Sequence, residues 1–316
     1  MKRICVIGAN GFIGKSLCKA LKASGNLTQG FVRTLNLNKN YDEIKYIQLG
    51  DIRSKINLKD QFHNCDCIIH CAGVADSINK RNKLDIFCSV NVEGTKNLAE
   101  EAVIAGVKRF IFLSSVKVYG ESAGKIEDLK IFTNYDTPNP QDNYSKSKFE
   151  AEKILWEISS KTALEVVVVR LPLVYGIGAK GNLERLMKLI NFKIPLPFKS
   201  IKNKRSLIGI DNAVDMLIRC IKHPDAAGKT FLVSDGEDLS TPELVRFIAS
   251  AMDQPVKLFS LPKVLLKFFG FITGKKKEMK KLIGSLQIDN SYTRKILNWT
   301  PPVSVEEGIR RMVKDK

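Results

Sequence analysis

Residues 3–14 have the sequence RICVIGANGFIG, in which a short apolar strand runs through a glycine-rich turn into a helix. Gly8 permits the tight turn, Gly11 lets a pyrophosphate approach the backbone, and Gly14 allows the helix to pack closely on the strand. The helix N-terminus then faces the phosphates with its free amide groups. The stretch therefore predicts a dinucleotide site formed by Gly8, Gly11, Phe12, Ile13 and Gly14.

Apolar runs alternate with amphipathic stretches beyond this turn. Strands are predicted at residues 3–7, 28–33, 45–49, 67–71, 109–114, 165–170 and 230–233, and helices at 12–23, 90–105, 144–159 and 212–222. Continuous Val/Ile strands between helices are typical of a parallel sheet covered on both faces. We predict an α/β fold: a Rossmann-type doubly wound parallel sheet with a smaller, mixed C-terminal substrate domain.

The change in pattern after residue 171 sets the expected domain boundaries. Residues 1–171 and about 208–233 are predicted to form the dinucleotide-binding domain. Residues 172–207 and 234–316, which prolines interrupt repeatedly, are predicted to form the substrate domain. In such open α/β sheets, ligands bind at the carboxyl ends of the strands.

The composition limits the classes of function. The chain has 316 residues, with 51 lysines and arginines against 33 acidic residues, giving a net charge of +18. This excess indicates either an anionic partner or a lysine-rich solvated surface. We find no nucleic-acid-binding module and expect no nucleic-acid partner. The seven cysteines are odd in number and form no CxxC pair, which favours reduced thiols and a cytoplasmic location.

Signals for export, membrane insertion and metal binding are missing from the sequence. The predicted first strand begins at residue 3, so we expect no signal peptide. No apolar run approaches the roughly 18 residues of a membrane span. Because there are three histidines and no paired Cys/His spacing, we expect no metal site.

Three residues form a candidate catalytic group. Tyr144 and Lys148 are four residues apart on a predicted helix, so they lie on one face. The positive charge of Lys148 favours the phenolate and lowers the pKa of Tyr144 from about 10. Ser115 ends the fifth predicted strand, where its hydroxyl can bond the substrate oxygen that Tyr144 protonates or deprotonates.

The GxxGxxG spacing and the Ser115/Tyr144/Lys148 group resemble the extended short-chain dehydrogenase/reductases, the NAD-dependent epimerase/dehydratase family. The resemblance implies an oxidoreductase on a nucleotide sugar, with Tyr144 and Lys148 also contacting the cofactor. It adds cofactor-binding residues at the strand ends and in the predicted helix at 90–105, namely Asp51, Ile52, Cys71, Ala72, Gly73, Asn91 and Pro172.

The residue after the second strand bears on the choice of cofactor. An acid there binds the adenosine ribose hydroxyl, whereas a cation accommodates a 2′-phosphate. The strand ends at Phe31-Val-Arg-Thr34, which contains Arg33 and no acid. Arg33 therefore favours NADP(H) over NAD(H), although an arginine that stacks on adenine would suit either cofactor.

The residues after Ser115 bear on the reaction. Dehydratases of the family carry an Asp-Glu pair there, whereas this chain has Val116 and Lys117, so we exclude dehydration. LSSVKV at 113–118, PQDNY at 140–144 and RLPLVYG at 170–176 resemble UDP-N-acetylquinovosamine dehydrogenases. The resemblance implies reduction of the C4 keto group of a UDP-4-keto-6-deoxy-N-acetylhexosamine for surface polysaccharide such as O-antigen. The substrate-binding residues it implies are Ser115, Lys117, Tyr175, Asn182 and Arg205.

Two other functions stay open at this point. A UDP-glucose or UDP-N-acetylglucosamine 4-epimerase would keep its NAD and show no net redox change. A non-catalytic NADP-sensing protein is the third reading, although such proteins commonly lose the Tyr/Lys pair, and this chain has both residues.

Partners are predicted from two further features. The family often dimerises through helices equivalent to 90–105 and 144–159, so we expect a homodimer. Residues 259–281 place apolar side chains on one helical side with lysines nearby, which suits either weak peripheral membrane contact or packing on the substrate domain. The apolar side chains of this segment are Leu261, Val264, Leu265, Phe268, Phe269 and Ile272.

Overall fold

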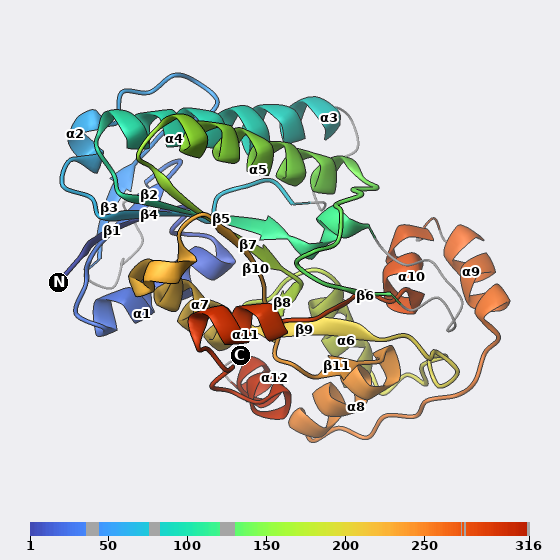
Figure 1. Ribbon diagram of the computed structural model, residues 1–316. Helices are drawn as coiled ribbons and strands as arrows, with labels where there is room; N and C mark the ends of the chain where they lie inside the picture. The colour runs from blue at the N-terminus through green and yellow to red at the C-terminus, as the bar shows by residue number, and fades with distance from the viewer. Residues whose placement is uncertain (36–43, 76–82, 121–129, 273, 275, 315–316) are drawn as a thin grey trace.

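Seven parallel strands form the centre of the computed structural model, which describes residues 1–35, 44–75, 83–120, 130–272, 274 and 276–314 (Figure 1). Their order across the sheet is β10-β7-β5-β4-β1-β2-β3. The strands are β1 (Arg3–Ile7), β2 (Leu27–Val32), β3 (Lys45–Gln48), β4 (Cys67–His70), β5 (Arg109–Ser115), β7 (Glu165–Leu171) and β10 (Lys229–Leu232). Each agrees with its predicted strand to within about a residue.

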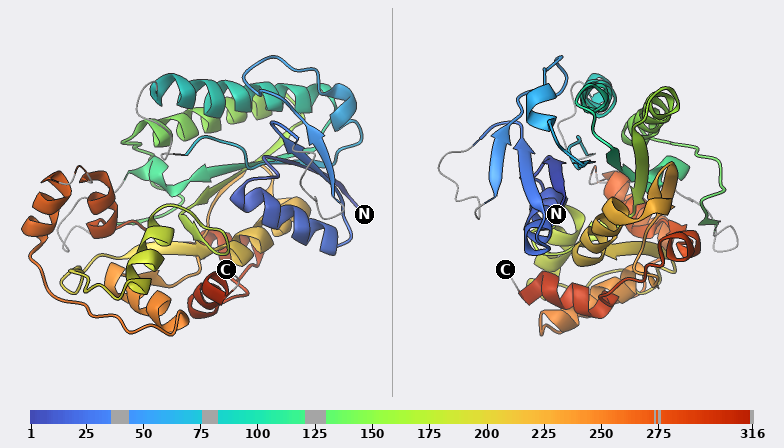
Figure 2. Two further views of the ribbon diagram at one scale, coloured as in Figure 1. Left: turned by 180° about the vertical axis from the view of Figure 1, so that it is seen from behind. Right: turned by 60° about the vertical axis from the view of Figure 1, so that its left-hand side comes forward.

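Helices cover both faces of this sheet (Figures 1 and 2). One core lies between the sheet, α1 (Phe12–Ala23) and α7 (Ile210–Lys222). The other lies between the sheet, α4 (Gly94–Ile104) and α5 (Asn143–Lys161). The four valines of β7 alternate between these cores, so all four are fully buried. The structure confirms the predicted doubly wound α/β fold.

The predicted helix at 90–105 differs from the observed one. A π-helical segment, Phe87–Glu93, follows the short α3 (Lys83–Ile86) and precedes α4. Such wide turns are rare and occur often at functional sites. Asn91 lies in this segment with its side chain buried, and it bonds backbone that follows β4. Hydrophobic spacing gives no signal for this change of helical pitch.

A smaller lobe carries a three-stranded sheet of mixed direction, in the order β11-β9-β8. Its own apolar core joins this sheet to helices from both ends of the C-terminal region. The elements are β8 (Leu173–Tyr175), α6 (Asn182–Asn191), β9 (Arg205–Gly209), β11 (Asp238–Leu239), α8 (Thr241–Ala251) and α12 (Val305–Lys314). The exact division into two domains stays a prediction.

The remaining elements connect or border the two parts. β6 (Ile131–Phe132) pairs with β12 (Gln287–Ile288), α2 (Lys59–Phe62) precedes β4, and α11 (Ser291–Leu297) packs beside β10. The predicted amphipathic segment 259–281 forms two helices, α9 (Lys263–Ile272) and α10 (Lys276–Ile283). Among the described residues, no helix is long and apolar enough to cross a bilayer.

The close packing of α1 on the sheet yields a stability prediction. Leu17 is fully buried in the core beneath α1, so Leu17→Ala should lower the free energy of unfolding by about 2–5 kcal/mol. The exposed Ile104 of α4 serves as the control, and Ile104→Ala should change it by less than about 0.5 kcal/mol. Urea unfolding measures both, and equal effects would contradict the assigned core.

Candidate active site

The glycine turn between β1 and α1 has the geometry of a phosphate cradle. Gly8 has a φ of +80°, and a Cβ there would lie 2.7 Å from the backbone nitrogen of Ala72. A Cβ on Gly14 would lie 2.2 Å from the carbonyl oxygen of Gly8. The first turn of α1 holds no acidic residue, and Gly11 caps it without a side chain. The helix N-terminus is therefore open to an anion.

Gly30 also serves this turn, and sequence reasoning missed it. A Cβ on Gly30 would lie 2.9 Å from the Cβ of Ala9 and 3.0 Å from the Tyr46 ring. β2 therefore needs glycine to approach the turn. The only signal in the sequence is a glycine within a predicted strand, which indicates a close backbone approach.

The residues predicted to read the adenosine lie at the ends of β2 and β3. Arg33 is exposed one residue beyond β2, and its carbonyl oxygen accepts a bond from Gly50. Asp51 is bonded by the Arg53 guanidinium, which lowers the pKa of this carboxyl to about 2. Asn97 of α4 donates to the carbonyl oxygen of Ile52 and so holds the turn.

The turn after β4 brings Gly73 beneath two predicted residues. A Cβ on Gly73 would lie 3.1 Å from Oδ1 of Asn91 and 3.2 Å from Nζ of Lys148. Asn91 accepts a bond from the Val74 amide and donates to the Val74 carbonyl oxygen and to Ser147. The structure therefore brings Gly73, Asn91 and Lys148 together, while the cofactor-binding role of the segment Cys71-Ala72-Gly73, Asn91 and Lys148 stays a prediction.

Lys148 is buried at the centre of this arrangement. Its ammonium group donates to the carbonyl oxygen of Leu113 at 2.9 Å and lies 4.5 Å from the centre of the Phe112 ring. Burial lowers the pKa of Lys148 from 10.5 to about 8. The Lys148 ammonium group is thus held near the end of β5, shielded from water.

Tyr144 and Ser115 belong to two different elements, α5 and β5. Tyr144 lies in the first turn of α5, four residues before Lys148, and contacts Phe87 edge-on. Ser115 ends β5, and its hydroxyl oxygen accepts a bond from the Lys117 amide. α5 itself begins at a capping box formed by Asp142 and its N3 serine. The predicted catalytic residues are therefore placed by a strand end and a capped helix.

A second cation lies beside the phenol. Nζ of Lys117 is 6.0 Å from the centre of the Tyr144 ring and 3.4 Å from a carboxylate oxygen of Asp142. Although burial opposes it, the Ser145 amide and the Lys117 charge lower the pKa of Asp142. Asp142 thus links the start of α5 to the turn after Ser115.

A buried ion pair supports this region, and the sequence analysis did not identify it. Glu152 of α5 accepts bonds from Arg170 of β7 and from Ser114. Arg170 also donates to the hydroxyl of Tyr119, 2.5 Å away. The two partners of Arg170 are 18 and 51 residues away in the chain, so no local sequence motif predicts these contacts.

The predicted substrate residues of the smaller lobe are less uniform. Pro172 is buried after β7, and Asn182 begins α6, partly exposed. Tyr175 is 1% exposed and donates to Asp235 at 2.7 Å, so its side chain belongs to the lobe's core. Arg205 donates to the carbonyl oxygens of Lys281 and Gly284, which end α10. The structure thus places Tyr175 and Arg205 in structural contacts that the sequence did not predict.

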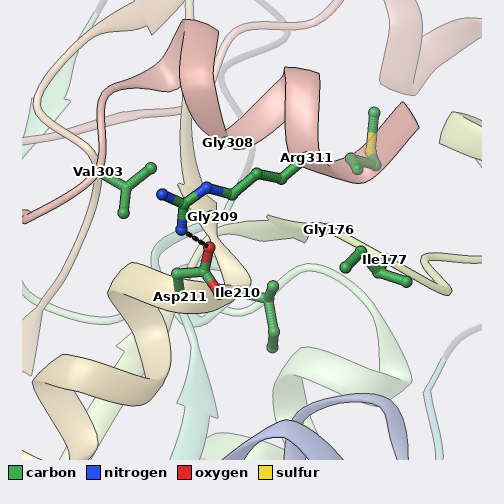
Figure 3. Close-up of a pocket in the computed structure, with 9 residues that line it drawn as sticks. Gly176, Ile177, Gly209, Ile210, Asp211, Val303, Gly308 and Arg311 are labelled. Carbon is green, nitrogen blue, oxygen red and sulfur yellow. Dashed lines mark hydrogen bonds and ion pairs between the residues drawn. The ribbon is translucent and has the colours of Figure 1, made fainter. Parts of the chain in front are cut away.

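A small cavity of about 20 Å³ lies apart from the catalytic group, among Gly176, Gly209 and α12 (Figure 3). Figure 3 shows the Arg311 guanidinium pointing toward Asp211, and the two are 2.9 Å apart. This volume suits one water molecule and not a nucleotide.

The residues described above fit a bound nicotinamide dinucleotide. A Cβ at Gly8 or Gly14 would strike neighbouring backbone, so the tight turn requires glycine there, and the N-terminus of α1 offers amide donors to a pyrophosphate. Lys148 lies under Gly73, where a ribose hydroxyl would meet it. Among the described residues, no three His, Cys, Asp or Glu side chains gather as metal ligands would.

Comparisons with known proteins identify relatives along the whole chain. The profile of the NAD dependent epimerase/dehydratase family matches residues 4–234. A Vibrio cholerae protein named UDP-glucose 4-epimerase is 40% identical over 314 residues, 98% of this chain and 94% of the relative. An Escherichia coli O157:H7 protein named N-acetyl-alpha-D-glucosaminyl-diphospho-ditrans,octacis-undecaprenol 4-epimerase is 25% identical, covering 98% of this chain and 93% of its own.

Solved structures share the fold. MoeE5 in complex with UDP-glucuronic acid and NAD superimposes with a TM-score of 0.79 at 22% identity, covering 99% of this chain and 98% of its own. The UDP-N-acetylglucosamine 4-epimerase of Bacillus cereus gives a TM-score of 0.80 at 18% identity, with 99% and 98% coverage. These two likenesses concern the fold alone.

Two of the finer predictions from the sequence find no support in these comparisons. The relative at 40% identity bears the name of a 4-epimerase and not of a quinovosamine reductase. The preference for NADP(H), inferred from Arg33, is likewise unsupported, since MoeE5 and a Bacillus cereus 4-epimerase are in complex with NAD. The homodimer, the cytoplasmic location and the role in polysaccharide synthesis stay predictions.

The buried ammonium group makes stability depend on pH. The unfolded chain has Lys148 with a pKa near 10.5, while the folded value is about 8. Between these values the unfolded state binds more protons, so stability gains a contribution as pH rises from about 8 to 10.5. Lys148→Met should abolish this contribution, so the stability of wild type relative to the variant should rise across that window.

Urea unfolding at several pH values measures this difference. Lys153, on the same helix and exposed, supplies the control Lys153→Met. A wild-type-to-variant difference that stays flat for Lys148→Met, or changes equally for Lys153→Met, would contradict the buried charge.

The approach of backbone beneath Lys148 yields a binding prediction. A methyl group in Gly73→Ala would press on Asn91 and Lys148, so we expect turnover to fall by about 10–100-fold and NAD affinity to fall with it. Calorimetric titration with NAD measures the affinity, and thermal unfolding checks that the variant folds. Unchanged affinity and turnover in a folded Gly73→Ala protein would show that the close approach has no role.

Proposed function

This chain belongs to the NAD-dependent epimerase/dehydratase family, and on that premise we propose that it is a UDP-sugar 4-epimerase that retains NAD. The observation that carries the proposal is the 40% identity, over 98% of the chain, to the protein named UDP-glucose 4-epimerase. UDP-glucose and UDP-N-acetylglucosamine are therefore the first substrates to test.

The catalytic group supports a reaction at a sugar hydroxyl. Lys148 bonds the end of β5, which Ser115 terminates, and Tyr144 precedes Lys148 by four residues on α5. Ligands of open α/β sheets bind at this edge. The residues after Ser115 are Val116 and Lys117, so this chain has no acid/base pair there to eliminate water. Proton transfer to and from one hydroxyl is then the chemistry that these side chains can perform.

The cofactor site is proposed along the ends of β1, β2 and β4. Gly8, Gly11 and Gly14 would hold the pyrophosphate at the N-terminus of α1. Asp51 and Arg33 would border the adenosine, and Lys148 would bond the ribose beside Gly73. NAD bound there supplies the hydride acceptor and donor for C4 of the sugar.

Proton transfer is assigned to Tyr144. Its phenolate takes the proton of the C4 hydroxyl as hydride leaves C4, and it returns the proton to the same oxygen when hydride comes back on the opposite face. Ser115 bonds that oxygen throughout. The ammonium groups of Lys148 and Lys117 favour the phenolate because both lie near the ring or on its helix face. The proposed epimerisation needs no external reductant, because the hydride and the proton that leave the sugar both return to it.

Product analysis separates this proposal from the reductase. The purified protein is incubated with UDP-glucose or UDP-N-acetylglucosamine without added cofactor, and the products are resolved by chromatography. We expect the corresponding galacto sugar. In parallel, a UDP-4-keto-6-deoxy-N-acetylhexosamine is supplied with NADPH or NADH. Stoichiometric loss of the reduced cofactor there, with no epimer in the first assay, would overturn the epimerase and favour the reductase.

The role of Tyr144 predicts the effect of removing one oxygen atom. Tyr144→Phe should lower kcat by about 10²–10⁴-fold while the protein stays folded, because general acid–base catalysis contributes that range. Tyr135, 84% exposed and outside the catalytic group, gives the matched control Tyr135→Phe, which should keep wild-type kcat. Wild-type turnover in a folded Tyr144→Phe protein would remove the phenol from the mechanism.

A further inference from the structure

The positive charge of the chain is concentrated in two segments. Residues 188–205 contain five lysines and one arginine with no acidic residue, and residues 257–283 contain eight lysines and one glutamate. Their net charges of +6 and +7 make up +13 of the +18 of the whole chain. The proposed reaction uses little of this charge, since Arg205 alone among these residues was expected to meet the substrate.

The two segments lie side by side at one end of the molecule. Leu196 donates its amide to Lys257, and the Phe259 amide bonds the carbonyl oxygen of Leu196. The Ser200 hydroxyl bonds the carbonyl oxygen of Leu261, just before α9. Both views along the length of the molecule show α9 and α10 at the end away from the N-terminus (Figures 1 and 2). The described parts of the two segments therefore lie next to each other at one end of the molecule.

Large apolar side chains are exposed in the same two segments. Phe192, Val264, Phe271 and Ile272 are each 62–77% exposed. On α9, Phe271 and Ile272 follow Val264 by seven and eight positions, so the three lie on one side of the helix, while Leu266 on the opposite side is buried. We call this exposed set, with the exposed lysines named below, the basic apolar surface. The other side chains of the predicted amphipathic segment, at 263, 267–270 and 275–277, lie outside the residues that the structure describes.

Exposed lysines occur in the same segments as these apolar groups. Lys193, Lys199 and Lys202 lie in the first segment, where Lys193 directly follows Phe192, and Lys257 and Lys280 lie in the second. Among the described residues, Glu184 pairs with Lys188 and Glu243 pairs with Lys204 at the border of the first segment.

We propose that the basic apolar surface binds the enzyme to an anionic lipid membrane. Apolar side chains enter the headgroup boundary while lysines beside them meet the lipid phosphates, and each basic residue adds to the attraction. A second copy of the chain is disfavoured as the partner, because docking two copies of this surface would bring their positive charges together. A nucleic acid is disfavoured because it could stack only on Phe192 and Phe271 and would leave the aliphatic Val264 and Ile272 unused, whereas a membrane interface accepts all four apolar side chains.

Membrane binding is independent of the proposed reaction. The basic apolar surface includes none of the catalytic residues or the glycine cradle. Arg205 bonds the carbonyl oxygens at the end of α10, which joins this surface to the smaller lobe. The proposal places the enzyme next to a membrane reaction that consumes or supplies its sugar.

Flotation with lipid vesicles tests the proposal on the full chain. Vesicles of phosphatidylcholine with phosphatidylglycerol should carry the protein upward at low ionic strength, whereas pure phosphatidylcholine vesicles should not. Salt at about 0.5 M should release most of the bound protein, because screening shortens the reach of the charges. Failure to float with the anionic vesicles at low salt would overturn the proposal, as would equal binding to both kinds of vesicle.

Two variants separate the charged and the apolar contributions. Lys193→Gln with Lys199→Gln and Lys202→Gln should lower the partition coefficient by roughly 100-fold, at about fivefold per lysine. Phe271→Ser with Ile272→Ser should lower it by about tenfold or more. Both variants should keep wild-type epimerisation of a soluble UDP-sugar, so a failed reaction and a failed membrane contact are distinguishable.

The control variant removes equal charge elsewhere. Lys59→Gln, Lys222→Gln and Lys295→Gln alter exposed lysines on α2, α7 and α11. This variant should bind vesicles within about twofold of wild type. A loss as large as that of the first variant would show that net charge and not this surface drives binding. If the free protein sediments as a dimer, and the variant Phe271→Ser with Ile272→Ser sediments as a monomer, the surface binds a second copy of the chain and not a membrane.

Discussion

The burial of the Lys148 ammonium group is the constraint on which the site depends. A buried cation is costly unless a polar group accepts a hydrogen bond from it. In this chain the carbonyl oxygen of Leu113, near the end of β5, accepts that bond. That contact fixes the distance between α5 and the central sheet. Gly73 must then stay free of a Cβ, and the π-helical turn must carry Asn91 to the same place.

The sheet and the phosphate turn could be predicted because they depend on local patterns. Glycine spacing, apolar runs and the Tyr144/Lys148 interval act over a few residues, and the structure confirms the fold they indicate. Arg205 and Tyr175 could not be placed, because their partners lie 76 and 60 residues away in the chain. The Asp51–Arg53 pair is local but needs the turn's backbone geometry, which spacing does not reveal.

The two parts of the molecule divide the work in physical terms. The parallel sheet presents backbone amides and one buried cation at its carboxyl edge, which suits a dinucleotide and a hydroxyl that loses and regains a proton. Most of the excess positive charge lies in residues 188–205 and 257–283. Backbone bonds between residues 196–199 and 257–259, with a bond from the Ser200 hydroxyl to Leu261, join these segments. The proposed membrane contact would give this charge a use.

The most direct measurement follows the hydrogen at C4 of the substrate. UDP-glucose labelled with deuterium at C4 is incubated with the protein, without added cofactor, and the products are analysed by NMR. The account predicts UDP-galactose that keeps its deuterium at C4, because hydride leaves and returns within one active site. Loss of the label to water, or no galacto product from UDP-glucose or the labelled N-acetyl analogue, would contradict it.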